Sequence, residues 1–543
     1  MPILVKDFII EASAVHSELA LKKALAEKLG TATSDITSIK VLKRSLDARK
    51  KRNLLYHYQI EFCALDEKKL LDLHPQWLAH TEPSKTPHPL STSNQKRTLK
   101  EPVIIIGSGP AGQSAAFLFA EAQIPTIIVE RGQPVEQRIK DVGRLQRRGE
   151  LDVESNYCYG EGGAGTFSDG KLTCGRRHPL IRYLFETWVR FGAPEDILYE
   201  AHPHIGTDYL LKMTKNLRLF IEQQGGQFLF GKRLVDIAPG RSAKMAVTLS
   251  DGQVLESDHV ILAIGHSARD TYRLLQMRNI AMQPKPFAMG VRVEHPQELI
   301  DEIQYGTCHQ DLGVHAAEYK LVAHTESRGI WTFCMCPGGH LLPTSAQAGH
   351  LAINGMSYHA RNSGFANAAL VVNILREDFF QGDVLDGVRF QEDLEKAAYK
   401  MGGGSYACPA QRLEDFIAER SSVGELKSTY RPKVNPGRLD QLLPKYVVSA
   451  LQTALVDYNR RMRGFINSQA LIVGLESKTS APIMMPRNEL FQSISHAGLY
   501  PCGEGAGFAG GIVSAALDGL RIAQSIVEHE LSENITLNVS IKT

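Results

Sequence analysis

The chain has 543 residues, of which 43% are hydrophobic and 22% charged, a balance that excludes a disordered, collagen-like or coiled-coil protein. Lys and Arg number 61 against 59 Asp and Glu, so the formal net charge is +2 and predicts no overall attraction to nucleic acid or an anionic membrane. Eight cysteines without a C-x-x-C pair predict free thiols in a reducing cytoplasm and no metal site.

Residues 1–78 are predicted to form a small α+β module. A strand-like VKDFIIEA is followed by a helical stretch over His16–Gly30, which ends on a glycine at the C-cap position. Two further strands are expected at Ile36–Leu42 and Leu54–Ala64, because YHYQIEF alternates with the period of a half-buried strand. The predicted order is β-α-β-β. The Pro-, Ser- and Thr-rich composition of residues 79–101 predicts a linker.

Seven Lys and Arg residues gather between Lys40 and Arg52. One interpretation is a docking patch for RNA or an acidic partner, and the other is a solvated hairpin connection. We favour the second, because no aromatic residues interleave the charges as single-strand binding would require. We therefore expect neither a nucleic-acid nor a membrane partner.

A dinucleotide-binding motif follows the linker. Val103–Ile106 is a continuous apolar run, typical of a buried parallel strand, and Gly107, Gly109 and Gly112 then form G-x-G-x-x-G before a predicted helix at Gln113–Ala122. In this motif the first glycine allows the turn, the second lets the backbone approach a pyrophosphate, and the third lets the helix pack on the strand. A second strand ends at Glu130, which would accept hydrogen bonds from ribose hydroxyls.

The motif alone leaves NAD and FAD open, and two later segments favour FAD. SDHVILAIG (257–265) predicts a strand running into Gly265, and after 238 residues GLYPCGEGAGFAGGIVSAALDGL brings a short strand, Gly503-Glu504 and a helix near Gly511. This order resembles the glutathione-reductase-like flavoproteins. The resemblance implies that Glu504 binds ribityl hydroxyls and that the backbone near Gly511 faces the pyrimidine end of the flavin.

A glycine-rich loop narrows the resemblance. YGEGGAGTFSDGKL (159–172) carries five glycines, which permit close backbone approach and positive φ. Together with the segments 333–372, 401–416 and 431–444, it resembles a bacterial and plastid family of uncharacterised FAD-dependent dehydrogenases. The resemblance covers nearly the whole chain and implies a flavin-dependent redox fold without an established substrate.

These features predict an α/β fold in three parts: the module, a discontinuous Rossmann-like FAD-binding domain (102–270 and 495–532), and an inserted α+β substrate domain (271–494). The insertion shows no second dinucleotide motif, so NADH or NADPH is expected only as a transient donor. FAD is expected to bind non-covalently. The predicted cofactor-binding residues are Gly107, Ser108, Gly109, Pro110, Ala111, Gly112, Glu130, Arg131, Arg138, Gly163, Gly165, Thr166, Val235, Ala263, Gly265, Gly503, Glu504, Gly511 and Ile512.

Three side chains are candidates for catalysis. Lys171 could bind a substrate carboxylate or stabilise reduced flavin, although it could equally pair with Asp169 on the surface. Cys336 follows Cys334 by two residues on a predicted strand, which would point both sulfurs to one face, but cysteines are often small buried hydrophobes. His340 could act as a general acid or base.

The sequence thus predicts an FAD-dependent oxidoreductase that transfers hydride or electrons through flavin N5 to or from an unknown small molecule. The alternative is a protein whose FAD is structural or sensory and which acts as a binding or RNA-associated, tRNA-modifying factor. Neither the oligomeric state nor the substrate follows from the residues.

Overall fold

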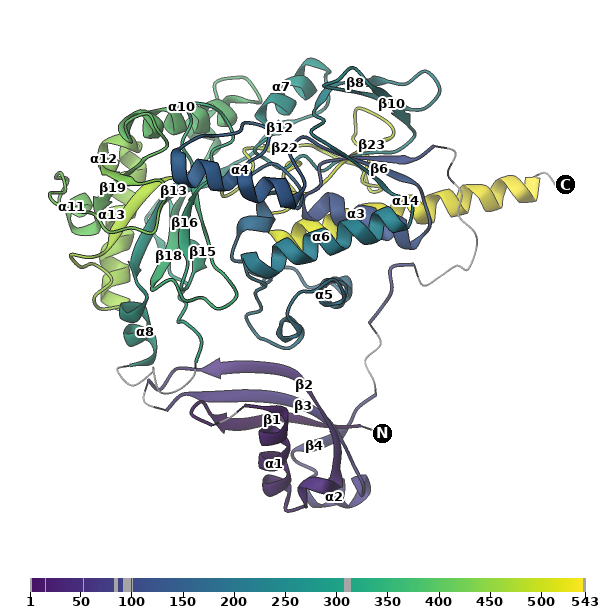
Figure 1. Cartoon of the computed structure of the whole chain (residues 1–543), viewed down its shortest axis with the longest axis vertical. Coiled ribbons are helices and arrows are strands. Elements are labelled where there is room, and N and C mark those ends of the chain that lie inside the picture. The colour runs from purple at the N-terminus through teal and green to yellow at the C-terminus, as the bar shows by residue number, and fades with distance from the viewer. Residues whose placement is uncertain are drawn as a thin grey trace.

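The chain is described from a computed structural model. The structure describes residues 2–14, 16–51, 53–82, 86–90, 99, 101–306 and 314–540. For residues 530–540 it describes the backbone alone. Arg52 and much of the predicted linker lie outside the described residues. The chain forms a small N-terminal module below a larger body, and its last helix, α14, extends away from that body (Figure 1).

The N-terminal module is a four-stranded antiparallel sheet with two helices on one face (Figure 1). Helix α1 begins after Ser17, whose hydroxyl accepts a hydrogen bond from the Ala20 N–H, and ends at Gly30 with φ 64°. The structure adds a second helix and a fourth strand to the predicted elements, so the order is the β-α-β-β-α-β of a ferredoxin-like unit. The elements are β1 (Ile3–Glu11), α1 (Glu18–Leu29), β2 (Ile36–Asp47), β3 (Leu55–Ala64), α2 (Glu67–Leu73) and β4 (Leu78–His80), with a 3-10 turn at Thr33–Asp35.

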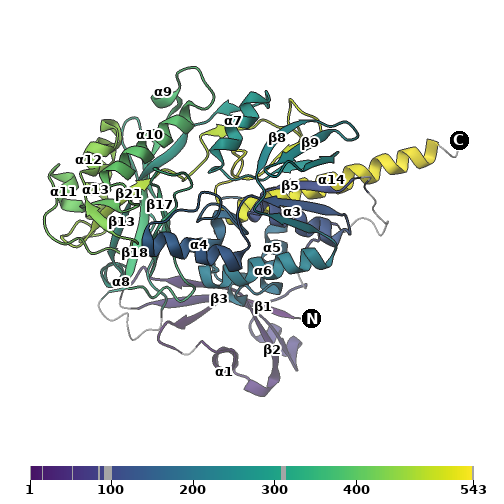
Figure 2. The same cartoon turned by 45° about the horizontal axis from the view of Figure 1, so that its top comes forward.

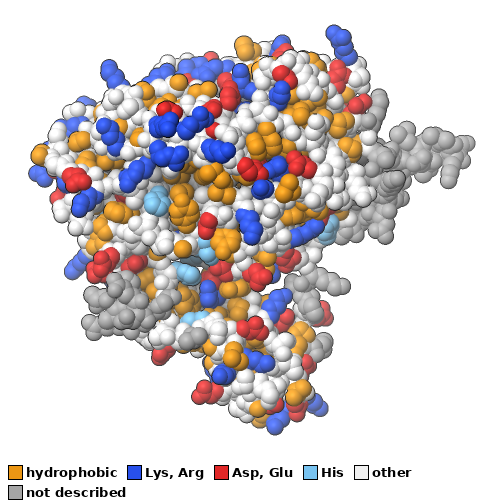
Figure 3. All heavy atoms as spheres, viewed as in Figure 1, with side chains coloured by type: hydrophobic (Ala, Val, Ile, Leu, Met, Phe, Trp, Pro, Cys, Tyr) orange, Lys and Arg blue, Asp and Glu red, His pale blue; other side chains and the backbone are white. Residues whose placement is uncertain are grey.

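The basic segment is only partly the hairpin connection that the sequence predicted. Strand β2 runs to Asp47, so Lys40, Lys43 and Arg44 lie on a strand and only the following residues join it to β3. Basic and acidic side chains are interspersed over the visible face of the module (Figure 3). Arg44 is turned towards the body, where its guanidinium pairs with the carboxylate of Glu200. The basic segment therefore contributes to the contact between the N-terminal module and the body.

A five-stranded parallel sheet forms the centre of the body, in the order β23-β11-β5-β6-β7. The central strand β5 is buried along its whole length, which explains its unbroken apolar sequence VIII. Helix α14 packs against α3, and Figure 2 shows both beside this sheet. The strands are β5 (Val103–Ile106), β6 (Thr126–Glu130), β7 (Gln227–Phe230), β11 (Val260–Leu262) and β23 (Leu499–Pro501), and the helices are α3 (Pro110–Glu121), α4 (Val135–Arg148), α5 (Leu180–Arg190), α6 (Thr207–Gln223), α7 (Arg269–Met277) and α14 (Ile512–Ser540).

Shorter elements complete this part of the chain. An antiparallel meander follows β7 and packs with the parallel sheet around a common apolar cluster that includes Ile104, Val247 and Leu262. Its strands are β8 (Leu234–Pro239), β9 (Met245–Leu249) and β10 (Val254–Ser257), and two 3-10 turns lie at Gly163–Phe167 and Glu195–Leu198.

The region predicted as an inserted domain carries a seven-stranded mixed sheet, in the order β14-β15-β18-β13-β21-β19-β20, and we call this region the cap (271–494). Two strand pairs lie outside that sheet: β12 (Gln283–Pro284) with β22 (Ile483–Met484), and β16 (His340–Pro343) with β17 (Ile353–Met356). The sheet strands are β13 (Phe287–Pro296), β14 (Val322–His324), β15 (Gly329–Cys336), β18 (Phe365–Ile374), β19 (Cys408–Arg412), β20 (Val434–Pro436) and β21 (Leu471–Glu476). The helices are α8 (Gln297–Tyr305), α9 (Arg376–Phe379), α10 (Asp386–Met401), α11 (Leu413–Ile417), α12 (Leu439–Leu442) and α13 (Lys445–Arg461).

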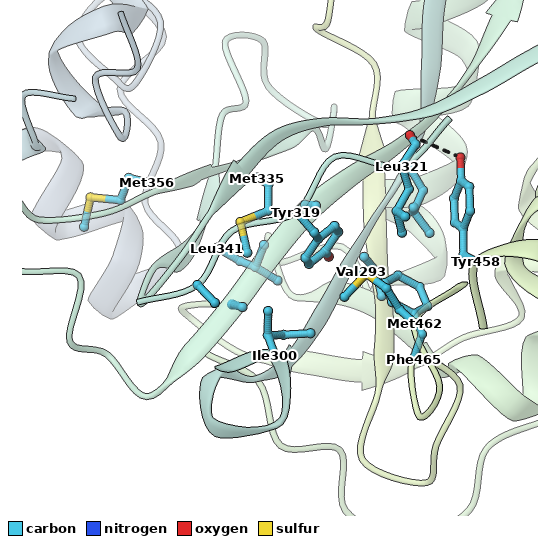
Figure 4. Close-up of a cluster of buried hydrophobic side chains, with 14 of the residues drawn as sticks. Val293, Ile300, Tyr319, Leu321, Met335, Leu341, Met356, Tyr458, Met462 and Phe465 are labelled. Atoms are coloured by element: carbon cyan, nitrogen blue, oxygen red, sulfur yellow. Dashed lines mark hydrogen bonds between the residues drawn. The ribbon is translucent and has the colours of Figure 1, made fainter. Parts of the chain in front are cut away.

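The cap packs around an extended hydrophobic core. Figure 4 shows Val293, Tyr319 and Phe465 packed with Met462 in this core, and the Tyr458 hydroxyl directed at the Leu321 carbonyl. The same apolar cluster continues into residues of the module, whereas the helices around the parallel sheet form a separate one. In the described part of the chain, no helix is both long and apolar enough to span a bilayer.

Candidate functional site

One cavity joins the parallel-sheet domain to the cap. Its nucleotide wall, as we call it, contains the glycine turn after β5, the loop around Gly163 and the start of α14; its cap wall contains residues of β15, β17 and the loop after β21. The segments that line it are 106–111, 129–131, 157–159, 163–171, 232–234, 263–268, Thr271, 333–336, Thr344, 354–355, 478–479, 502–504 and 510–515, although not every residue in these ranges faces the cavity.

The three motif glycines perform separate steric tasks. Gly107 has φ +103°, and a Cβ there would lie 2.3 Å from the Ala263 carbonyl oxygen. A Cβ on Gly112 would lie 1.9 Å from the Gly107 oxygen, so only glycine lets α3 pack this closely on β5. At Gly109, in contrast, the nearest atom would be the Gly163 Cα at 3.8 Å. The backbone at the N-terminus of α3 is therefore open to a ligand, as a phosphate site requires.

Glu130 ends β6 and fixes the loops around it. One carboxylate oxygen accepts from the Ser108 N–H and hydroxyl at 2.9 and 2.8 Å, and the other accepts from the N–H groups of Gly132 and Gly160, both at 2.9 Å. A carboxylate offers about four acceptor sites, and four protein donors occupy them. The predicted ribose contact of Glu130 stays a prediction, and its observed contacts are structural.

The glycine-rich loop takes the backbone conformations that its composition predicts, with positive φ at Gly160, Gly162, Gly163 and Gly170. Arg138 of α4 lies behind it, fully buried. Its guanidinium donates to three carbonyl oxygens, of Asn156, Tyr157 and Glu161, at 2.7–3.1 Å. Burial lowers the pKa of this guanidinium to about 10, although Glu130 and Glu161 oppose the shift. Arg138 thus holds the loop from outside the cavity lining.

The ends of β11 and β23 meet at the cavity. His266 follows Gly265 and its Nδ1 lies 3.1 Å from Oε1 of Glu504. Both residues line the cavity, as do Gly511 and Ile512 at the beginning of α14. A helix N-terminus carries partial positive charge, which stabilises a negative group placed against it.

The cap wall depends on Arg292, which is fully buried. Its guanidinium donates to Oε2 of Glu476 at 3.0 Å, to Oδ1 of Asn354 at 2.9 Å and to the Cys334 carbonyl at 2.7 Å. Strand β15 is irregular between Phe333 and Cys336, and Cys334 has a φ of 41°. The two cysteines therefore do not share a regular strand face, although both line the cavity. Cys334 is exposed, whereas Cys336 is buried, and burial raises the pKa of the Cys336 thiol to about 11.

Lys171 belongs to a network of charges beside the cavity. Its Nζ lies 2.7 Å from Oε2 of Glu318 and 3.8 Å from Oδ2 of Asp169. Asp169 in turn accepts a hydrogen bond of 2.8 Å from buried Arg361. Burial alone would raise the pKa of Asp169, but Arg361 and Lys171 lower it below its ordinary value. The surface pair with Asp169 that the sequence left open is thus a secondary contact, and Glu318 of the cap is the main partner.

The structure brings most of the predicted site residues to the cavity. Those that line it are Gly107, Gly109, Pro110, Ala111, Glu130, Arg131, Gly163, Gly165, Lys171, Ala263, Gly265, Cys336, Glu504, Gly511 and Ile512. Those outside the lining are Ser108, Gly112, Arg138, Thr166, Val235, His340 and Gly503. His340 instead starts β16, where its ring lies edge-on to Tyr358. It is therefore not placed to act on a ligand in this cavity.

Sequence reasoning missed the residues that follow β21 and β16. Lys478 and Thr479 come from the polar run Ser477–Ser480, directly after an apolar strand, and Thr344 follows the apolar end of β16. Polar residues just after a buried strand were the available signal. They could not be assigned to the cavity, because it depends on how the cap sits against the nucleotide wall.

The chain matches proteins of related sequence. Residues 286–479 match a family model described as FAD-dependent protein, C-terminal domain-like, and residues 6–63 match a domain of unknown function (DUF8436). Over 513 residues the chain is 39% identical to a protein from Clostridium beijerinckii described as uncharacterized, with 94% of this chain and 96% of that protein covered. The chain belongs to the family of this clostridial protein. The matched range 286–479 includes Cys334, Cys336 and Lys478, so much of the cap wall lies within it.

Solved structures resemble the chain only distantly. A geranylgeranyl bacteriochlorophyll reductase-like protein from Thermoplasma acidophilum is 12% identical with a TM-score of 0.33, over 81% of this chain and 80% of the other. Glycerol-3-phosphate dehydrogenase from Bacillus halodurans, complexed with FAD, is 11% identical with a TM-score of 0.36, over 80% and 64%. Likenesses this weak carry no argument about the function of this chain.

Proposed function

We propose that this protein is an FAD-dependent oxidoreductase that acts on a small molecule bound between the nucleotide wall and the cap wall. The observation that carries the proposal is the shared cavity. It begins at a glycine turn and helix N-terminus suited to a pyrophosphate and continues to cap residues within the region that matches FAD-dependent proteins. Binding sites at the carboxyl ends of parallel strands are the rule in open α/β sheets.

The residues present fit FAD. A Cβ at Gly265, Gly510 or Gly511 would meet no atom within 4 Å, so the backbone there borders open space, whereas one at Gly109 would make only an ordinary contact of 3.8 Å. The N-terminus of α3 would hold the phosphates through its N–H groups, and the beginning of α14 would stabilise negative charge on the flavin. When bound, the flavin supplies the hydride or electron transfer. The chain supplies binding, orientation and a partly buried site.

The glycine motif gives the first test, because Gly109 is open where the pyrophosphate is expected. Gly109→Glu places a carboxylate at this position and should abolish flavin loading, whereas Gly175→Ala, at a site with no neighbour within 4 Å, should retain it. Flavin content is read from the absorbance of the purified protein after incubation with FAD. Wild-type protein that neither retains nor takes up FAD would overturn the proposal.

We further propose NADH or NADPH as a transient electron donor. The test is an anaerobic absorbance trace of the flavin-loaded protein during addition of each nucleotide. Bleaching of the flavin band by either one supports a nicotinamide-linked reductase. An unchanged band with both would overturn this part of the proposal and assign electron donation to the substrate itself or to another protein.

A further inference from the structure

The cations of the cavity lining differ in how they are balanced. Of the residues that the structure describes, five Lys and Arg side chains line the cavity. Four of them pair with carboxylates: Arg131 with Glu154 and Asp270, Lys171 with Glu318, Lys232 with Asp251, and Arg233 with Glu154 and Asp270. The fifth is Lys478. Among the described residues, no carboxylate oxygen lies within 4 Å of its ammonium group.

Lys478 is buried, with 8% of its surface exposed. Its Nζ donates to the Thr344 carbonyl oxygen at 2.8 Å and contacts Sγ of Cys158 at 3.3 Å. Neither partner is a carboxylate. The acids at longer range, Glu395 and Glu476, are bound to Arg269 and Arg292. A buried charge is costly unless a counter-charge pairs with it. The Lys478 ammonium group has no such counter-charge within contact distance among the described residues.

Unpartnered polar groups line the same cavity as this lysine. Thr344 Oγ1, Thr479 Oγ1 and His266 Nε2 are shielded from solvent and have no hydrogen-bond partner in the part of the chain that the structure describes. All three residues line the same cavity, and each is 8% exposed. Buried polar side chains are normally hydrogen-bonded, so three unsatisfied ones in one cavity with an unbalanced cation indicate a polar ligand.

We propose that Lys478, Thr344 and Thr479 form a subsite for an anionic group, a carboxylate or a phosphate, on the molecule that the enzyme acts on. This inference rests on the proposed function, because it takes the cavity as the substrate site. Lysine binds either anion as a point charge, and the threonine hydroxyls can donate to the same oxygens. The phosphates of FAD have the same chemistry, but their expected place is the N-terminus of α3 on the other wall.

The test compares Lys478→Met with Lys396→Met, which removes an exposed lysine of α10 whose partner is Asp393. Calorimetry measures binding of benzoate and of inorganic phosphate to the full-length protein, and absorbance measures its flavin content. Wild type and Lys396→Met should bind at least one probe. Lys478→Met should bind it about tenfold more weakly or worse, a loss of about 1.4 kcal/mol, with unchanged flavin content. Lys478→Arg, which keeps the charge, should restore most of the binding.

Three results would overturn the proposal. The first is equal probe binding by wild type and Lys478→Met, and the second is no binding of either probe by wild type. The third is a Lys478→Met protein that loses flavin but keeps probe binding, since the lysine would then hold the phosphates of FAD. Should Lys478→Met not fold, Thr479→Val provides the same comparison. Wild-type protein without flavin refutes the proposed function, while probe binding still decides whether the subsite exists.

Discussion

A fully buried arginine lies behind each wall of the cavity, and the two arginines are satisfied differently. Arg138, behind the nucleotide wall, donates to three backbone carbonyls, and burial lowers its pKa to about 10. Arg292, behind the cap wall, is equally buried, but Glu476 outweighs the effect of burial and its pKa is raised. Arg138 therefore holds the glycine-rich loop through hydrogen bonds to neutral carbonyl groups. Arg292 instead joins strands β13 and β21 through an ion pair.

This difference indicates how each wall is built. Most of the nucleotide wall depends on backbone geometry between Gly107 and Gly170, and the start of α14 completes it from far along the chain. The cap wall depends on side chains that are far apart in the chain, since Arg292 and Glu476 are separated by 184 residues. At the glycines of the nucleotide wall, almost any added side chain should be destabilising. At a buried charge pair, in contrast, one partner can change only if the other changes with it.

The largest expected effect comes from Arg292→Met. Removing the guanidinium leaves Glu476 buried without its partner, which should lower the free energy of unfolding by about 3–5 kcal/mol. Arg138→Met should lower the free energy of unfolding by less, because it leaves buried carbonyl groups, rather than a charge, without a hydrogen-bond partner. The double variant Arg292→Met/Glu476→Leu should recover much of the loss. Denaturant unfolding of the four proteins tests the comparison, and equal losses in the two single variants would contradict it.

The next effect concerns an ion pair that joins the parallel-sheet domain to the cap. Arg269 of α7 binds Glu395 of α10 through two hydrogen bonds of 2.7 and 2.8 Å. Burial would raise the pKa of Glu395, but Arg269 lowers it to about 2. A lowered carboxyl pKa gives stability that is complete above the unfolded value of 4.5 and is lost as pH falls towards the folded value.

Between about pH 6 and pH 3, this pair should contribute about 2 kcal/mol to the fall in wild-type unfolding free energy. Glu395→Gln removes the titrating group, so its stability should be lower near neutral pH and should fall less on acidification. Unfolding by denaturant at several pH values measures both curves. Parallel curves for the two proteins would show that Arg269 does not lower the pKa of Glu395.

A smaller effect is expected at the glycine turn. Gly→Ala in a helix normally stabilises by about 1 kcal/mol. At Gly112, however, the new Cβ would lie 1.9 Å from the Gly107 oxygen. Gly112→Ala should therefore reverse the sign and destabilise by about 1–3 kcal/mol, because α3 must move away from β5. Gly175→Ala is the matched control and should change stability by less than about 0.5 kcal/mol. A stabilised Gly112→Ala protein would disprove the steric account of the nucleotide wall.

The smallest effect lies where the module meets the body. Arg44 and Glu200 are partly exposed, with 17% and 19% of their side chains accessible, so Glu200→Gln should cost about 1 kcal/mol or less. The backbone hydrogen bonds between Arg44 and Tyr199 and between Ala201 and Arg44 remain in this variant. Thermal unfolding at low and high salt measures the loss, which should shrink as salt screens the pair. A loss that does not depend on salt would mean that the junction is not electrostatic.

The sequence determined the elements whose signals are local. The unbroken apolar run of β5, the glycines after it, and Gly30 at the end of α1 each follow from the conformations that those residues allow, and the structure has strand, turn and helix at these places. Helix α2 and strand β4 were missed. They are short, and β4 is stabilised by pairing with β1, about 70 residues earlier.

The residues of the cap wall could be assigned only once the tertiary structure was known. Lys478 reaches the cavity because β21 ends beside β13, and it meets Thr344 and Cys158 from segments 134 and 320 residues away. Lys171 likewise pairs mainly with Glu318 rather than Asp169, because folding brings the distant Glu318 next to it. Turn and helix signals act over a few residues and are written in the sequence, whereas the balance of buried charge depends on which distant side chains folding brings together.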